Sequence, residues 1–253
     1  MNGRELHFYL AGINNQNFLM RDRETGTWWQ QITGKAIYGP LQGSALDLVL
    51  SDELTFGEWR TEFPRGEVLA PVPQYLKEYD SKWEPEVAKL PVVISFPGTE
   101  LKPRDVVIGV DVNGVARAYP WETFVKQSPV MDRVNGTLLL LVLGPDGKSF
   151  RVFVSRVNGQ DAEFFLQTNG ANRMAASPVD ENGKGNFDDK PNRDFSAKAW
   201  MLVDSLTASQ WNFQGCAVSG PVHGKCLERL PALKDYWFDW RNYHSETTIY
   251  RRQ

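Results

Sequence analysis

The sequence predicts a β-rich α+β fold in which two related units, each made of a β-hairpin, a strand and a short helix, pack around one core with further hairpins between them. Three observations predict this fold. Two stretches of the chain repeat each other at a fixed spacing, Asn-Gly follows Val three times between them, and Gly and Pro separate short runs of β-branched and aromatic residues. The length of 253 residues suits one such domain.

The repeat is clearest between residues 34–60 and 215–241, which align without a gap. Eight of the 27 aligned positions are identical, whereas ordinary composition gives about two. Just upstream, an element with Asp, Thr and Trp at the same spacing occurs at residues 22–29 and again at 204–211. We interpret the repeat as an internal duplication. The identical pairs are Gly34/Gly215, Ala36/Ala217, Gly39/Gly220, Pro40/Pro221, Gly43/Gly224, Leu46/Leu227, Trp59/Trp240 and Arg60/Arg241.

The first copy, residues 19–69, contains signals for each of its elements. Asp, Thr and Gly at 22–26 predict a turn between strands, and residues 28–37 predict a strand. Apolar residues spaced two to four apart from 54 to 63 predict a short helix, which Ser51 and Asp52 could cap. The second copy, residues 201–250, repeats this order and carries Tyr236, Trp237, Trp240 and Tyr243 on its helix.

The remaining segments are connections and hairpins. Residues 70–105 contain regularly placed prolines and predict an irregular connecting segment. Residues 106–167 predict central hairpins, because Asn-Gly favours the tight turn between two strands. Residues 168–198 are rich in Asn, Asp and Gly and predict a surface excursion. Residues 4–10 predict either an edge strand or the continuation of a longer natural domain.

Several of these motifs together resemble one known family. They are Leu19 to Trp29, Gly34 to Gly43, Phe56 to Trp59, Ile108 to Val110, Ala116 to Pro120 and Phe238 to His244. The family is catalogued as domain of unknown function 3179, and the resemblance covers nearly the whole chain. It implies a bacterial or archaeal source and export, but no catalytic residue. Members begin with a Cys-Pro-x-Cys element, and we expect this sequence to start after it.

Composition and charge exclude some classes of partner. The net charge of -3 leaves no basic excess to neutralise a phosphate backbone, so we expect no nucleic-acid partner. The longest apolar run, Leu138–Leu143, is far shorter than the ~20 residues of a membrane span. The chain also lacks the common nucleophile-elbow, P-loop and metalloprotease motifs.

Tryptophan suggests the leading functional hypothesis. The chain contains 9 Trp, and aromatic rings on a surface can receive flat ligands. We expect a ligand-binding or scaffolding module whose aromatic groove lies near the seam of the two copies and takes a small-molecule or carbohydrate-like ligand. An alternative is that the second helix is covered on both sides by the fold. The proposed groove residues are Trp29, Trp59, Trp211 and Trp240.

The competing hypothesis is an enzyme. A pseudo-twofold arrangement could pair Asp22 with Asp204 and Glu58 with Asp239, and paired acids can hydrolyse glycosidic bonds. Asp22 and Asp204 could instead only stabilise turns, and Glu58 and Asp239 could lie on the polar side of short helices. We predict no cofactor, although zinc or copper could bind a set of two thiols and two imidazoles, unless the thiols pair or are simply buried. That set is Cys216, His223, Cys226 and His244. The acidic stretch at 180–189 is a poor calcium loop because Lys184 interrupts it.

Overall fold

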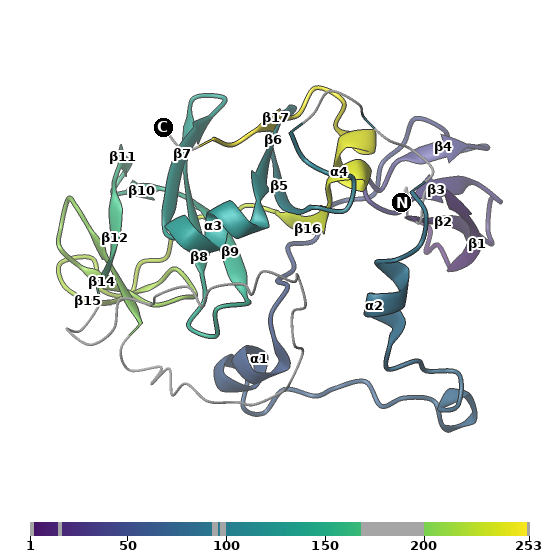
Figure 1. Ribbon diagram of the computed structural model, residues 1–253, viewed down its shortest axis with the longest axis horizontal. Coiled ribbons are helices and arrows are strands. Elements are labelled where there is room, and N and C mark those ends of the chain that lie inside the picture. The colour runs from purple at the N-terminus through teal and green to yellow at the C-terminus, as the bar shows by residue number, and fades with distance from the viewer. Residues whose placement is uncertain (1–2, 15–16, 93–95, 97–99, 168–199, 252–253) are drawn as a thin grey trace, which may run out of the picture. The chain divides into compact units, whose positions relative to one another are not determined.

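The computed structural model describes residues 3–14, 17–92, 96, 100–167 and 200–251. The protein is β-rich, with short helices and several small sheets (Figure 1). None of the helices in these ranges is long and apolar enough to cross a membrane. Two compact units form. Unit 1 contains Met1–Ser51, Leu69–Val107 and Asp235–Thr248, and unit 2 contains Asp52–Val68, Ile108–Lys234 and Ile249–Gln253.

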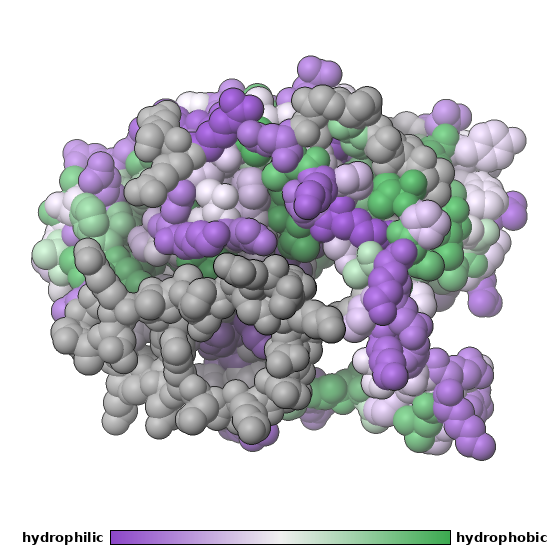
Figure 2. Space-filling model, in the orientation of Figure 1, coloured by the Kyte–Doolittle hydropathy of each residue, from purple (hydrophilic) through white to green (hydrophobic). Residues whose placement is uncertain are grey.

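Unit 1 is built on an antiparallel sheet with the strand order β1-β2-β3-β4. The strands are β1 (Phe8–Asn14), β2 (Asn17–Asp22), β3 (Trp28–Gln30) and β4 (Ala36–Tyr38). Strand β1 is an edge strand of this sheet. Hydrophobic residues gather on the surface over β1–β4 (Figure 2). The unit also contains the short helices η1 (Pro73–Tyr75) and α2 (Trp83–Val87) of the connecting segment, and helix α4 (Trp237–Tyr243).

The prediction of one strand over residues 28–37 was wrong. Strands β3 and β4 are separate, because the chain turns between them at Gly34, whose φ of 63° belongs to the left-handed region. The side chain of Gln30 fixes this turn by accepting hydrogen bonds from the backbone N–H and hydroxyl of Thr33, both at 2.6 Å. A turn fixed by the polar side chains of Gln30 and Thr33 thus separates two strands that the apolar pattern had joined into one.

Unit 2 contains a second sheet of four antiparallel strands and a sheet of three. The first has the order β12 (Phe164–Gln167), β13 (Met201–Asp204), β14 (Gln210–Trp211), β15 (Ala217–Ser219). The other has β7 (Val130–Val134), β8 (Thr137–Leu143) and β9 (Phe150–Val154). Strands β10 (Arg156–Val157) and β11 (Gln160–Asp161) form a hairpin, and helices α1 (Phe56–Glu62) and α3 (Trp121–Gln127) belong to this unit. One further sheet has the order β16 (Leu233–Tyr236), β5 (Val106–Val112), β6 (Val115–Pro120), β17 (Thr248–Ile249).

The three predicted Asn-Gly turns are confirmed. Each connects two consecutive strands, and both residues of each turn have positive φ, as a two-residue hairpin of this type requires. The turns are Asn113-Gly114, Asn135-Gly136 and Asn158-Gly159.

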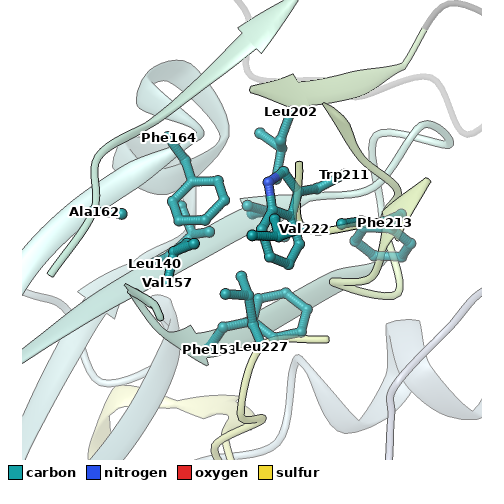
Figure 3. Close-up of a cluster of buried hydrophobic side chains, with 12 residues drawn as sticks. Leu140, Phe153, Val157, Ala162, Phe164, Leu202, Trp211, Phe213, Val222 and Leu227 are labelled. Carbon is teal, nitrogen blue, oxygen red and sulfur yellow. The ribbon is translucent and has the colours of Figure 1, made fainter. Parts of the chain in front are cut away.

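Strand β8 lies at the centre of the interior of unit 2. Leu140 and Val142 on one face belong to a cluster that includes Trp211 and Phe213 (Figure 3). Leu139 and Leu141 on the other face belong to a second cluster. Because both faces are buried, the strand is a continuous apolar run rather than an alternating one.

The sheet β1–β4 and the sheet β12–β15 make the same contacts. The indole N–H of Trp29 donates to Asp22 at 2.8 Å, and that of Trp211 donates to Asp204 at 2.9 Å. An aromatic residue of the edge strand packs edge-on against each indole, Phe8 at 5.8 Å and Phe164 at 5.6 Å between ring centres.

One glycine follows the fourth strand of each of these two sheets, Gly39 after β4 and Gly220 after β15. A Cβ atom on Gly39 would lie 2.9 Å from the Cα of Thr27, and a Cβ atom on Gly220 would lie 2.6 Å from the Cα of Ser209. Both glycines also have positive φ. The close backbone contact explains why glycine stands at both positions.

Helices α1 and α4 also match in extent and in their ends. Each has seven residues, and each ends with a backbone bond from the residue after the helix, Phe63 to Trp59 in α1 and His244 to Trp240 in α4. The residue before α1 that caps it is Thr55 rather than the expected Ser51 or Asp52. Each helix lies in the unit of the other copy's sheet: α4 belongs to unit 1 and α1 to unit 2.

Candidate functional site

Three of the four predicted ligand-binding tryptophans lie inside the protein. Trp29, Trp211 and Trp240 are 0%, 1% and 3% exposed. The indole N–H of each also donates a hydrogen bond inside the protein. That of Trp240 donates to the hydroxyl of Thr247 at 2.9 Å. These rings fill the interior of their units and present no face to a ligand. Trp59, the fourth, is half-buried.

Trp59 is the middle ring of an aromatic row on the outer side of α1, formed by Phe56, Trp59 and Phe63. The first two rings are stacked with centres 5.7 Å apart, and the last two lie 6.4 Å apart. Phe56 is 60% and Phe63 51% exposed. The guanidinium of Arg60 lies over Phe56 at 5.8 Å, and Gly66 packs so closely against Trp59 that it leaves no room for a Cβ atom.

The inner side of α1 is held by a buried arginine. The guanidinium of Arg151 donates two hydrogen bonds to Glu62, at 2.6 and 2.8 Å, and two to Asp52, at 2.7 and 3.2 Å. It also lies 4.5 Å from the ring centre of Phe213, and its side chain is 3% exposed. Burial alone would lower the pKa of Arg151, but the bonds to Glu62 and Asp52 outweigh it and raise the pKa.

The start of α1 is fixed by a second set of bonds. The hydroxyl of Thr55 accepts from the backbone N–H of Glu58 and donates to Asp146 at 2.6 Å. Ser149 also donates to Asp146, and accepts from the backbone N–H of Thr55 at 2.9 Å. These bonds hold the pKa of Asp146 below its usual value although burial acts in the opposite direction.

Glu58 and Asp239 occupy matching positions on α1 and α4, and both carboxyl groups are buried. Burial is the main reason that the pKa of Glu58 is raised, and the charges of Asp146 and Glu62 add to it. Burial likewise raises the pKa of Asp239, whose carboxyl accepts a hydrogen bond from the Asn17 amide. The two acids belong to different units, Glu58 to unit 2 and Asp239 to unit 1.

Asp22 and Asp204 serve the turns that follow them. Burial would raise the pKa of each, but the indole N–H groups and the hydroxyl and backbone groups of Thr25 and Thr207 outweigh it, and both pKa values are lowered. Thr207, for example, donates its N–H and its hydroxyl to Asp204 at 2.6 and 2.7 Å. Carboxylates with this many donors suit a structural role.

A family model described as "Protein of unknown function (DUF3179)" matches residues 1–247. The chain belongs to the DUF3179 family. No curated protein matches this DUF3179 chain, and no solved structure does.

The four predicted metal ligands of the DUF3179 protein do not form a metal site in the structure. Cys216 and Cys226 form a disulfide, so their sulfur atoms are not thiolates. His223 is exposed in the turn between them, and the ring of His244 stacks on Trp240 with centres 3.8 Å apart. Among the residues that the structure describes, no three His, Cys, Asp or Glu side chains gather in a way that could hold a metal. The acidic stretch at 180–189 lies outside the described residues.

Sequence reasoning missed the residues that surround Glu58 and Asp239 in this DUF3179 protein. The sequence could have pointed to Arg151, because it is the one charged residue in the apolar strand Phe150–Val154. A charged residue in such a strand is rarely buried without partners. Asp146 and Asp235 had no comparable signal. Asp146, for example, binds the nearby Ser149 and also Thr55, which lies 91 residues away, and the sequence does not show the second contact.

Proposed function

We propose that the protein is a ligand-binding module and that its ligand packs on the aromatic row of α1. The observation that carries this proposal is the exposure of the row, in which Phe56 is 60% and Phe63 51% exposed beside Trp59. Three adjacent rings on one helix face form a continuous apolar surface, and such surfaces usually mark a binding site.

The comparison with α4 supports the proposal. We infer that the two copies arose by duplication, because their sheets and helices make matching contacts. At the positions matching Phe56 and Trp59, helix α4 has Trp237 and Trp240, which are 1% and 3% exposed. Rings at these helix positions therefore pack in the interior on α4, whereas on α1 they lie at the surface.

The exposed rings are not needed to hold α1 in place. Helix α1 is anchored through its opposite side, where Glu62 binds Arg151 and Thr55 binds Asp146. The exposed rings add little to that anchorage. Gly66 and the neighbouring rings instead hold Trp59 in a fixed orientation, which lowers the entropy lost when a ligand binds.

The row suits a ligand with a flat apolar face and polar edges. Ring centres 5.7 and 6.4 Å apart can contact neighbouring sugar rings through their C–H faces, and Arg60 can donate to hydroxyl groups at the edge. An oligosaccharide is the ligand class that we propose.

Isothermal titration calorimetry with cello-, xylo- and chito-oligosaccharides tests the proposal. We expect one of these series to bind and Trp59→Ala to abolish the binding. Trp83→Ala is the matched control, because Trp83 is 62% exposed on another helix and should leave the affinity unchanged. If no series binds, or if Trp59→Ala binds as the unchanged protein does, the proposal is refuted.

We also propose that the protein works outside the cytoplasm. The disulfide between Cys216 and Cys226 supports this location, because disulfides persist mainly in oxidising compartments. Alkylation of free thiols in intact cells, followed by peptide mass spectrometry, should find both cysteines unmodified. Alkylated Cys216 and Cys226 would contradict the proposed location.

A further inference from the structure

The disulfide of unit 2 lies at the surface of that unit. Cys216 directly precedes β15 and Cys226 follows it, and the two residues face each other as an isolated antiparallel bridge with Cα atoms 4.0 Å apart. Cys216 is half-buried, whereas Cys226 is exposed. The residues that precede Cys226, Gly224 and Lys225, are exposed as well. A dissolved thiol can therefore approach the disulfide from the side of Cys226.

Backbone hydrogen bonds hold the loop between the two cysteines on both sides of the disulfide. Ala217 donates its N–H to the carbonyl oxygen of Lys225 at 2.8 Å and accepts a bond from the N–H of Gly224 at 2.9 Å. Beyond the cysteines, the N–H of Leu227 donates to the carbonyl oxygen of Gly215 at 2.8 Å. The disulfide thus closes a loop that these bonds already close. A disulfide that closes a short loop also contributes less to stability than one that closes a long loop.

Side chains anchor the same loop to the rest of unit 2. Val222 and Leu227 are 3% and 6% exposed, and both pack in the buried cluster that contains Trp211 (Figure 3). The ammonium group of Lys225 donates to the side chain of Asn158, in the turn between β10 and β11, at 2.7 Å. The apolar contacts and this bond do not involve the sulfur atoms, so they persist when the S–S bond opens.

Unit 1 builds the same loop without a disulfide. At the positions that match Cys216 and Cys226, Lys35 and Ala45 form the same isolated antiparallel bridge. The three backbone bonds of the loop recur there, at 2.9, 3.2 and 2.9 Å. They run from Ala36 to Ser44, from Gly43 to Ala36 and from Leu46 to Gly34. The conformation of this loop therefore does not require a covalent bond.

We propose that the disulfide between Cys216 and Cys226 is a thiol–disulfide exchange site whose substrate is a low-molecular-weight thiol. Exposed disulfides are the ones that take part in exchange, and the matching loop of unit 1 shows that the fold is kept without the bond. Because Cys216 is half-buried, a small thiol suits the site and attacks the sulfur of Cys226. The exchange site does not depend on the aromatic row of α1.

The exchange takes place in two balanced steps. The small thiol loses a proton to water, and its thiolate attacks the sulfur of Cys226 while the S–S bond breaks and Cys216 leaves as a thiolate that takes up a proton. A second small thiolate then attacks the sulfur atom that the first one contributed to the mixed disulfide, and Cys226 leaves and is protonated. Two small thiols are oxidised to one disulfide, and the two cysteines are reduced.

Reduced glutathione tests the proposal on the full-length protein without denaturant. Alkylation of the released thiols, followed by peptide mass spectrometry, measures the rate at which the disulfide opens. We expect this rate to lie within about tenfold of the rate for the protein unfolded in urea, since access limits exchange. If the disulfide opened only in the unfolded state, the rate would be lower by about a thousandfold or more.

Single variants show which sulfur atom reacts. Cys216→Ser leaves the exposed Cys226 as a thiol, and Cys226→Ser leaves the half-buried Cys216. We expect oxidised glutathione to form a mixed disulfide at least about tenfold faster in Cys216→Ser than in Cys226→Ser. Equal rates, or a faster reaction in Cys226→Ser, would contradict the proposed attack on Cys226.

A double variant tests whether the loop folds without its covalent bond. Cys216→Lys with Cys226→Ala places the two residues of the unit 1 bridge at the matching positions, and its circular dichroism spectrum should equal that of the unchanged protein. Trp59→Ala should exchange at the unchanged rate, which separates this proposal from ligand binding on α1. Failure of the double variant to fold, or opening of the disulfide only at the rate of unfolding, would overturn the proposal.

Discussion

Replacement of Arg151 by methionine should sharply destabilise unit 2. The arginine side chain is 3% exposed and faces Glu62 and Asp52, whose side chains are 6% and 18% exposed. Methionine fills most of the space but leaves the carboxylate of Glu62 buried without its partner, while Asp52 keeps its ion pair with Arg229. Removal of one member of a buried ion pair costs about 3–5 kcal/mol, and Arg151 binds two acids. We therefore expect Arg151→Met to lower the free energy of unfolding by about 3–5 kcal/mol at neutral pH.

Urea unfolding, followed by circular dichroism, measures this free energy. Arg156→Met is the matched control, because Arg156 is 51% exposed and lies 3.5 Å from Asp161, and exposed pairs contribute only about 0–1 kcal/mol. The double variant Arg151→Met with Glu62→Gln should recover part of the loss, since it removes a buried charge that has no partner. A loss of less than about 1 kcal/mol in Arg151→Met would refute the reasoning.

Three further changes test other parts of the structure. The pKa of Asp204 is lowered, so the carboxylate stabilises the folded state above its pKa in the unfolded chain, and this stabilisation disappears as the pH falls. Asp204→Asn should therefore lower the free energy of unfolding by about 1–3 kcal/mol at neutral pH and by much less in acid. Urea unfolding at both pH values measures the difference. The pKa of Glu58 is raised, so the folded state binds the proton of Glu58 more tightly than the unfolded chain does and loses stability as the pH rises. Glu58→Gln should therefore raise the melting temperature at neutral pH and leave it unchanged in acid. Reduction of the disulfide between Cys216 and Cys226 should lower the free energy of unfolding by about 3 kcal/mol or less, which melting with and without a reductant would measure.

The sequence predicted those features that depend on neighbouring residues. The Asn-Gly turns formed as expected because positive φ at both positions is a local property of those residues. Adjacent residues of a strand point to opposite sides of it, and on β3 Trp29 is buried while its neighbour Trp28 is half-buried. The recurrence of Asp, Thr and Trp in the two copies predicted matching local contacts, which the two sheets make.

Features that depend on distant residues could not be predicted in the same way. The spacing of Trp240 placed it on a helix face but could not show that the face is covered, since the covering residues come from elsewhere in the chain. The partners of Glu58 and Asp239 were missed for the same reason. Arg151 is separated from Glu62 by 89 residues and Asn17 from Asp239 by 222, and neither pair leaves a pattern in the sequence.

The assignment of α4 to the sheet at the start of the chain has a consequence for synthesis on the ribosome. Strands β1–β4 are translated long before the helix that contacts them through Asn17, because the contacting residue Asp239 lies 222 residues further along the chain. Nascent domains usually fold in order from the N-terminus. Here the sheet β1–β4 must wait until α4 has been translated, and until then its apolar side is available to chaperones.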